Sequence, residues 1–150
     1  MNNFIFENST KVYFGKGSVK EFLADNLESY GNNVMLAYGG KSIKENGIYD
    51  EVTEILTAAG KNVIEFSGIM PNPTYKKVQE GATFAREKEV DFILAVGGGS
   101  VIDCCKIIAA QAVTEEDIWN MEGSCADRHD IRKAVPFTGN GRITFQKKVH

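Results

Sequence analysis

Continuous apolar runs alternate with amphipathic stretches along most of this sequence. Two of the runs predict strands at residues 34–38 and 91–96, and Asn62-Val63-Ile64-Glu65-Phe66 predicts a third at residues 62–66. A continuous apolar run is typical of a parallel strand that is buried on both faces, whereas a half-buried strand alternates apolar and polar residues. The run from Phe92 to Val96 is the most apolar in the chain, so we expect Ile93, Leu94 and Val96 to be buried.

The segments around these runs carry apolar residues at helical spacing. They predict helices over residues 18–30, 42–59, 74–88 and 100–112. A serine begins three of them and an acid follows three residues later, the spacing of an N-terminal capping box: Ser18 with Glu21, Ser42 with Glu45, and Ser100 with Asp103. Glycines supply the stops after the first two helices. The last helix is apolar on nearly every face, which predicts burial on several sides.

Two more β-type runs, Phe4-Ile5-Phe6 and Val12-Tyr13-Phe14, predict a pair of strands before the first helix. Strand alternating with helix then predicts an α/β fold, a doubly wound parallel sheet with helices on both faces. In such sheets a ligand binds at the carboxyl ends of the strands. The glycine-rich turns after residues 38 and 96 and the Pro71-Asn72-Pro73 loop all fall at those ends.

Charge and periodicity both change near residue 123. Residues 1–123 hold 11 Lys and Arg against 18 Asp and Glu, whereas residues 124–150 hold 6 against 2. We therefore predict an α/β domain over 1–123 and a basic, divergent tail over 124–150. Disorder, a frameshift, a truncated gene copy and a genuine divergent end are all open explanations of that tail.

Composition excludes several classes of protein. A net charge of −3 gives no reason to expect nucleic acid or anionic lipid as a partner. We see neither a secretion signal nor an apolar stretch near the roughly 20 residues of a membrane helix. The three cysteines lack zinc-site spacing and make a poor disulfide framework, which favours a reducing cytoplasm. Cys104 and Cys105 lie inside a predicted helix, where we expect them in the core.

The turn Gly97-Gly98-Gly99-Ser100 links the most apolar strand to a helix. Glycine lets the backbone approach a phosphate closely, and the first N–H groups of the next helix have no partner within that helix. With the helix dipole positive there, the turn suits a pyrophosphate. The alternative is an ordinary tight turn with a serine cap, because the pattern is not the G-x-G-x-x-G fingerprint of dinucleotide sites.

The turn Gly39-Gly40-Lys41-Ser42 stands at another strand end. An acid that binds the adenosine ribose hydroxyl selects NAD in many dinucleotide sites, and this turn contains none. Two glycines, a hydroxyl and Lys41 would instead accept a 2′-phosphate, which predicts NADP(H). The alternative is that Ser42 only caps a helix and that Lys41 is a solvated charge.

Over residues 4–123, several segments of the sequence together resemble the iron-containing (type III) alcohol dehydrogenases. The resemblance is closest to their NADPH-dependent butanol dehydrogenase group. These segments are Val12-Tyr13-Phe14-Gly15-Lys16-Gly17, residues 38–44, Gly47-Ile48-Tyr49-Asp50, residues 66–69, Pro71-Asn72-Pro73, residues 91–106 and Asp117-Ile118-Trp119. The glycine-rich part of this set also occurs in glycerol dehydrogenases and dehydroquinate synthases.

The resemblance implies a Rossmann-like nucleotide-binding domain, followed in the family by a helical domain whose Asp and three His hold Fe²⁺ or Zn²⁺. It implies NADP(H)-dependent interconversion of primary alcohols and aldehydes, and a homodimer formed through the N-terminal strands. The cofactor-binding residues that it implies are Gly39, Gly40, Ser42, Asn72, Gly97, Gly98, Gly99, Ser100 and Asp103. The family's next cofactor-binding stretch is only faintly matched by residues 135–141.

The sequence departs from the family in one respect, because it contains no metal-ligand set and ends well before the family's length. Its histidines are His129 and His150, both in the tail. We expect no catalytic residue and no metal ligand in this chain, and no activity from the chain alone. The alternatives are a non-catalytic nucleotide-binding fragment, an inert remnant, or a fragment of the glycerol dehydrogenase group.

Overall fold

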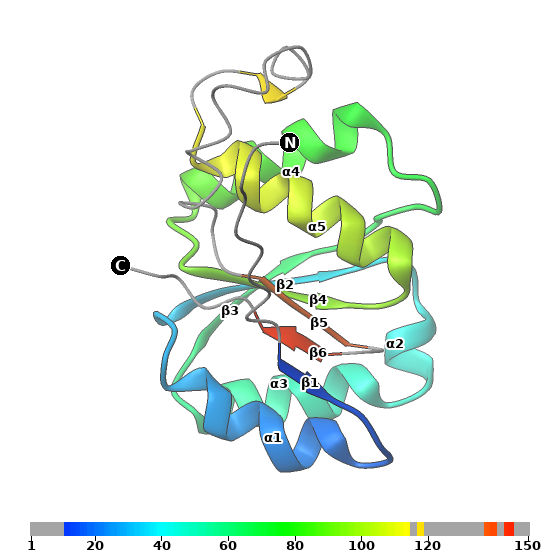
Figure 1. Cartoon of the computed structure of the whole chain (residues 1–150), viewed down its shortest axis with the longest axis vertical. Helices are drawn as coiled ribbons and strands as arrows, with labels where there is room; N and C mark the ends of the chain where they lie inside the picture. The colour runs from blue at the N-terminus through cyan, green and yellow to red at the C-terminus, as the bar shows by residue number, and fades with distance from the viewer. Residues whose placement is uncertain (1–10, 115–116, 119–136, 141–142, 146–150) are drawn as a thin grey trace, which may run out of the picture.

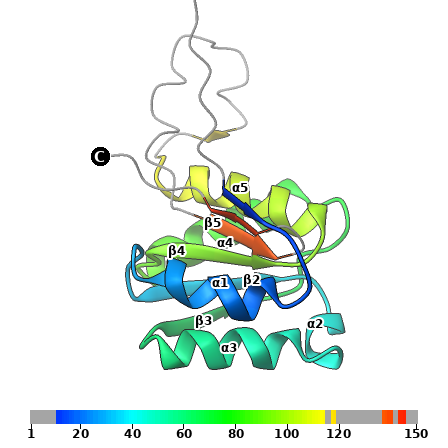
Figure 2. The ribbon, with the colours of Figure 1, turned by 60° about the horizontal axis from the view of Figure 1, so that its bottom comes forward.

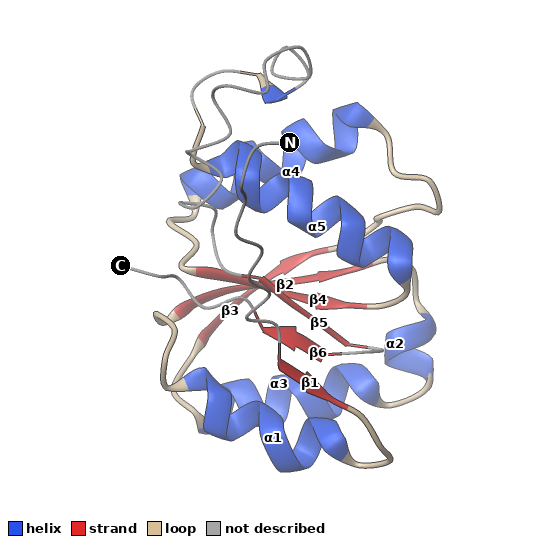
Figure 3. Ribbon diagram, viewed as in Figure 1, coloured by secondary structure: helices blue, strands red, loops and turns tan. Residues whose placement is uncertain are grey.

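The computed structural model describes residues 11–114, 117–118, 137–140 and 143–145. In chain order its elements are β1 (Lys11–Tyr13), α1 (Ser18–Leu27), β2 (Asn33–Tyr38), α2 (Ser42–Glu45), α3 (Ile48–Ala58), β3 (Asn62–Phe66), α4 (Tyr75–Glu87), β4 (Phe92–Val96), α5 (Gly99–Ala112), β5 (Phe137–Asn140) and β6 (Ile143–Phe145). Helices lie on both sides of a central sheet (Figures 1 and 3).

The central sheet has four parallel strands in the order β3-β2-β4-β5. Parallel pairing of the three strands predicted at residues 34–38, 62–66 and 91–96 is thereby confirmed. The predicted burial is confirmed as well, since Ile93 is 0%, Leu94 2% and Val96 2% exposed.

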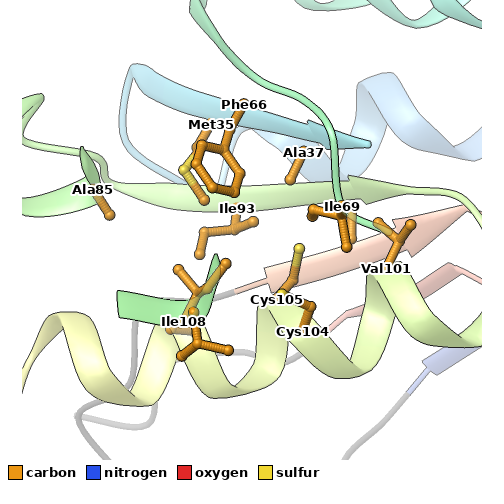
Figure 4. Close-up of a cluster of buried hydrophobic side chains, with 13 residues drawn as sticks. Met35, Ala37, Phe66, Ile69, Ala85, Ile93, Val101, Cys104, Cys105 and Ile108 are labelled. Carbon is orange, nitrogen blue, oxygen red and sulfur yellow. The ribbon is translucent and has the colours of Figure 1, made fainter. Parts of the chain in front are cut away.

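Alternate side chains of the central strands enter two separate cores. Met35, Ala37 and Ile93 pack with α4 and α5 on one face, around buried residues such as Ile108 (Figure 4). The intervening residues pack with α1 and α3 on the other face, and they include Val34, Leu36, Tyr38, Phe92, Leu94 and Val96. This alternation explains the continuous apolar runs, because a strand covered on both faces needs an apolar side chain at every position.

The cysteines Cys104 and Cys105 belong to the first of these cores and are both 0% exposed. Their placement in the core confirms the prediction from sequence. Burial raises the pKa of both thiols, so they stay protonated at neutral pH.

The predicted helix over 42–59 is wrong, because the structure divides it into α2 and α3. Gly47 separates them with φ of 76°, a left-handed backbone that no α-helix continues through. The stop at Gly60 is correct, since its φ of 70° lets the chain leave α3 after Ala58.

The three predicted serine caps are also wrong. Ser18, Ser42 and Ser100 all lie inside their helices, and the residues before those helices are Gly17, Lys41 and Gly98. Thr74 is a true N-cap, since its side-chain oxygen accepts a hydrogen bond from the Lys77 N–H. α5 packs against both α4 and the sheet, while Ile107 remains 44% exposed.

The sequence did not predict β5 and β6, which lie within residues 124–150. β5 extends the parallel sheet beside β4, and β6 pairs with β1 in an antiparallel two-stranded sheet. The predicted strand at residues 4–6 lies outside the described residues. The described helices include none long and apolar enough to span a membrane.

Candidate functional site

The candidate site follows from the way the chain leaves β2 and β4. These strands are neighbours, yet α3 follows β2 on one face of the sheet whereas α5 follows β4 on the other (Figure 2). Sheets of this kind bind ligands at such a switch point, outside the carboxyl ends of the strands. Tyr38 and Val96 are paired in register, so the turns after them start side by side. We call them the β2 turn (residues 39–42) and the β4 turn (residues 97–100).

The β4 turn holds an open stretch of backbone. Around Gly98 and Gly99 a Cβ atom would meet nothing within 4 Å. The N–H groups of Val101 and Ile102 donate to the Gly98 carbonyl. Those of Gly99 and Ser100 find no acceptor within the part of the chain that the structure describes. The start of this 14-residue helix therefore offers unpaired N–H groups and positive dipole to an anion.

Gly97 differs from the two glycines after it, because it packs closely against another residue. Its φ is 157°, and a Cβ atom there would lie 2.7 Å from Val101 Cγ2. This glycine is therefore required by the turn itself, and it lets α5 begin directly against the end of β4. Gly98 and Gly99 are not required in this way, because a Cβ atom at either position would have room.

The β2 turn packs closely on the loop after β3. A Cβ atom at Gly39 would lie 3.0 Å from the Ile69 carbonyl oxygen and 3.7 Å from Val101 Cγ2. The Gly68 N–H also donates to the Gly39 carbonyl at 2.9 Å. Gly40 faces open space, and Ser42 is exposed at the start of α2. Gly39 thus serves the packing, whereas Gly40 and Ser42 are accessible.

The loop between β3 and α4 brings Asn72 to the same edge of the sheet. Ile69 anchors the loop in the core at 3% exposure, and Thr74 caps the helix that follows. Asn72 is exposed and has a left-handed backbone with φ of 52°, which asparagine tolerates better than most residues. Its side chain makes no hydrogen bond to another described residue.

Asp103 lies one turn into α5 and is exposed. Its carboxylate forms an ion pair with Lys106 at 3.2 Å, one helical turn onward. The structure therefore places eight of the nine residues predicted from the sequence at the carboxyl edge, and the ninth, Asp103, one turn into α5. The strand β5 ends beside them, since its last residue, Asn140, pairs with Val96.

A polar cluster that sequence reasoning missed adjoins the β2 turn. The Glu65 carboxylate accepts hydrogen bonds from Tyr38 Oη at 2.5 Å and from Tyr49 Oη at 2.6 Å. Lys44 Nζ lies 3.4 Å from the same carboxylate and 4.3 Å from the centroid of the Tyr49 ring. The signal in the sequence is Glu65, the single charged residue of β3. The cluster joins β2, β3, α2 and α3 at the edge that carries the site.

These contacts change the acidity of the whole cluster. Hydrogen bonds from Tyr38 and then Tyr49 lower the pKa of Glu65, because they stabilise its charged form. The pKa of Tyr38 is raised, first by burial and then by the hydrogen bond to Glu65. The hydrogen bond to Glu65 raises that of Tyr49, and the pKa of Lys44 is raised by Tyr38 and Glu65. At neutral pH the cluster therefore holds one carboxylate and one ammonium.

Other features lie away from this edge. A hollow of about 440 Å³ stands at the far end of α5, between Gln79, Arg86, Gln111 and Val113. Within the described ranges no three His, Cys, Asp or Glu side chains gather as a metal site would require. His129 and His150 lie outside the described residues.

A family model and individual relatives of this chain were found among known proteins. The sequence model described as iron-containing alcohol dehydrogenase matches residues 9–138. Probable NADH-dependent butanol dehydrogenase 1 of Bacillus subtilis is 47% identical over 137 residues, which are 91% of this chain and 34% of that protein. NADPH-dependent aldehyde reductase YqhD of Escherichia coli is 39% identical over 136 residues, again 91% of this chain and 34% of that protein.

Solved structures agree with this family. NADH-dependent butanol dehydrogenase A of Thermotoga maritima superposes with a TM-score of 0.78 at 39% identity, covering 93% of this chain and 34% of that one. The aldehyde reductase YqhD superposes with a TM-score of 0.75 at 37% identity, covering 92% and 35%. The chain thus spans about a third of the length of these relatives.

Proposed function

The chain belongs to the iron-containing alcohol dehydrogenase family, and we propose that it forms the part of an NADP(H)-dependent alcohol or aldehyde oxidoreductase that binds the dinucleotide. One observation carries the proposal: two glycine-rich turns, from neighbouring parallel strands, meet at the switch point of the sheet. Nucleotides bind at this place in doubly wound sheets.

The residues present fit a dinucleotide. Gly98, Gly99 and Ser100 would hold the pyrophosphate at the start of α5, where unpaired N–H groups and open space coincide. Gly39, Gly40 and Ser42 would hold the adenosine ribose, with Gly97 shaping the turn between. Asn72 and Asp103 would flank the cofactor, Asp103 toward the nicotinamide.

Our proposal of NADP(H) rather than NAD(H) rests on the β2 turn. The relatives divide on this point, since the Bacillus protein is named NADH-dependent and the Escherichia protein NADPH-dependent. The turn itself contains no acid, and it carries one basic residue, Lys41. The nearby Glu65 carboxylate lies on β3 outside the turn, where hydrogen bonds from Tyr38 and Tyr49 fix its position.

The test is a matched pair of substitutions, Gly40→Asp and Gly98→Asp. Both positions have room for a side chain and neither has a positive φ, so both variants should fold. We expect Gly40→Asp to weaken NADPH binding at least tenfold relative to NADH, because a carboxylate there repels the 2′-phosphate. Gly98→Asp should weaken the binding of NADPH and of NADH to the same extent, because both cofactors contain the pyrophosphate.

Fluorescence titration of the purified chain with each cofactor measures these effects. Equal or better NADH binding by the unaltered chain would refute the NADP(H) proposal. No binding of either cofactor would refute the nucleotide site itself.

We propose that the whole enzyme interconverts primary alcohols and aldehydes. An Fe²⁺ or Zn²⁺ ion, when bound, would stabilise the charge that develops on the alcohol oxygen during hydride transfer. The residues of this chain would contribute the other half of the reaction, by fixing the cofactor so that its nicotinamide ring is held in one orientation.

A homodimer through the N-terminal strands and a cytoplasmic location complete the proposal. Val12 and Phe14 support the first, since they lie on and just after β1 at 60% and 86% exposure. Apolar side chains so exposed often mark an interface. The buried free thiols Cys104 and Cys105 support a reducing compartment.

A further inference from the structure

The polar cluster around Glu65 places a balanced pair of charges beside the β2 turn. Tyr38 immediately precedes Gly39, and Lys44 stands two residues after Ser42 on α2. The Lys44 N–H donates to the Lys41 carbonyl at 2.9 Å, so the Lys44 backbone lies one helical turn from the β2 turn, well within one Debye length of about 10 Å. A charge at this range acts on a phosphate bound at the turn.

The contacts of the cluster hold that pair in place from three sides. Tyr38 is only 5% exposed, so its phenol is a fixed donor to the Glu65 carboxylate. Tyr49 donates to the other carboxylate oxygen from the first turn of α3. Lys44 is bound less firmly, at 3.4 Å and with 48% of its side chain exposed. The carboxylate is therefore the rigid partner and the ammonium the adjustable one.

We propose that Glu65 and Lys44 form a specificity-determining pair that sets how strongly the β2 turn binds a 2′-phosphate. The carboxylate cancels most of the field of the ammonium at the turn and keeps Lys44 against Tyr49. Loss of the carboxylate leaves an unbalanced ammonium that attracts the phosphate. Loss of the ammonium leaves an unbalanced carboxylate that repels it. This inference rests on the proposed nucleotide site.

The alternative role is purely structural, in which Glu65 only ties α2 and α3 to β3. The two roles differ in what they predict for ligands. A structural tie affects every ligand of the turn alike and shows in the thermal stability of the chain. A charge pair affects only the ligand with the 2′-phosphate, and it does so in opposite directions for the two residues.

The experiment measures the binding of 2′,5′-ADP and of 5′-AMP to the 150-residue chain by calorimetry, at low and high salt. These probes differ only in the 2′-phosphate, so their affinity ratio isolates its contribution. The variants are Glu65→Gln, Lys44→Gln and the double variant. Glu54→Gln is the control, because it removes an exposed carboxylate from the middle of α3, farther from the turn.

We expect Glu65→Gln to raise the 2′,5′-ADP to 5′-AMP affinity ratio about threefold and Lys44→Gln to lower it about threefold, at low salt. The double variant should return the ratio to its original value, and 1 M salt should remove all the shifts. Glu54→Gln should leave the ratio unchanged.

Equal losses for both probes in Glu65→Gln, or no change of ratio in either single variant, would overturn the inference. An equal shift in Glu54→Gln would overturn it too, since net charge alone would then explain the result. If Glu65→Gln does not fold, the fall of the ratio in Lys44→Gln decides by itself. Failure of the original chain to bind either probe would instead refute the proposed nucleotide site, and this inference with it.

Discussion

Two glycines of the β4 turn should differ in what their substitution affects: replacing Gly97 should lower the stability of the fold, whereas replacing Gly99 should lower the affinity for the cofactor. In Gly97→Ala the new Cβ would stand 2.7 Å from Val101 Cγ2, on a backbone with φ of 157°. Backbone strain of this kind costs about 1–3 kcal/mol, and overpacking a buried contact costs about 1–3 kcal/mol more. Because part of the strain relaxes, we expect a loss of about 2–4 kcal/mol in the free energy of unfolding.

Gly99→Ala should behave in the opposite way. A Cβ atom there meets nothing within 4 Å, and Gly99 is the first residue of α5. We expect the free energy of unfolding to change by less than about 0.5 kcal/mol. The affinity for NADPH should nevertheless fall about tenfold, because the methyl group keeps the pyrophosphate from the backbone.

Urea denaturation followed by circular dichroism measures the first effect, and fluorescence titration the second. With a slope of about 2 kcal/mol per molar, Gly97→Ala should lower the urea midpoint by about 1–2 M. Val101→Ala supplies the control, since it removes the methyl groups that the new Cβ meets. The penalty of Gly97→Ala should shrink by about 1–2 kcal/mol in that background. An unchanged midpoint, or an equal penalty in both backgrounds, would refute the steric reasoning.

Three further predictions concern the helix contact, the acid limit of stability and catalysis. In Gly81→Ala the new Cβ would lie 2.4 Å from Ile108 Cδ1, so we expect a net loss of about 1–2 kcal/mol despite better helix propensity. Ile108→Val, which deletes that atom, should remove most of the loss in urea titrations, and a stabilised single variant would contradict this. Hydrogen bonds from Tyr38 and Tyr49 lower the pKa of Glu65 below its ordinary 4.5. Its contribution to stability is therefore full above the unfolded-state pKa and is lost as the pH falls through the lower folded-state pKa. The difference in urea midpoint between the original chain and Glu65→Gln should be constant above about pH 5 and shrink below it, whereas a difference that grows toward acid pH would show the wrong sign. Finally, the purified chain with Fe²⁺ or Zn²⁺, NADP⁺ and butanol should produce no NADPH beyond a metal-only control, since a catalytic metal needs three or four converging ligands and the sequence holds two histidines. Sustained production would refute this, and cofactor binding without turnover would favour a non-catalytic nucleotide-binding role.

The central strands β2 and β4 were predictable from the sequence because they are buried on both faces. Every position of the run from Val34 to Tyr38 faces one of the two cores, so the local pattern carries the tertiary information. The strand β5 was not predictable in this way. Phe137-Thr138-Gly139-Asn140 combines residues of low and high strand propensity, and its place beside β4 is set by a partner distant in sequence.

The positions of the site were predictable, but not its electrostatics. Glycines at strand ends follow from sequence order, whereas the caps were misassigned because Gly17 and Gly98 occupy the positions that serines usually fill. The sequence pattern alone did not single out Glu65. Its partners come from β2, α2 and α3, and only the folded arrangement brings two phenols and an ammonium to one carboxylate.

The pairing of β1 with β6 has a consequence for the order of assembly. Lys11 lies opposite Phe145, so the first described strand forms its ladder with the last (Figure 1). On a ribosome, β2, β3 and β4 would emerge and pair while β1 still lacked its partner. Closing so long a loop costs more entropy than the pairing of β2 with β4, because that cost grows with the intervening length. β1 is therefore synthesised before β2, β3 and β4 but pairs after them, which leaves its exposed Val12 open to incorrect partners during synthesis.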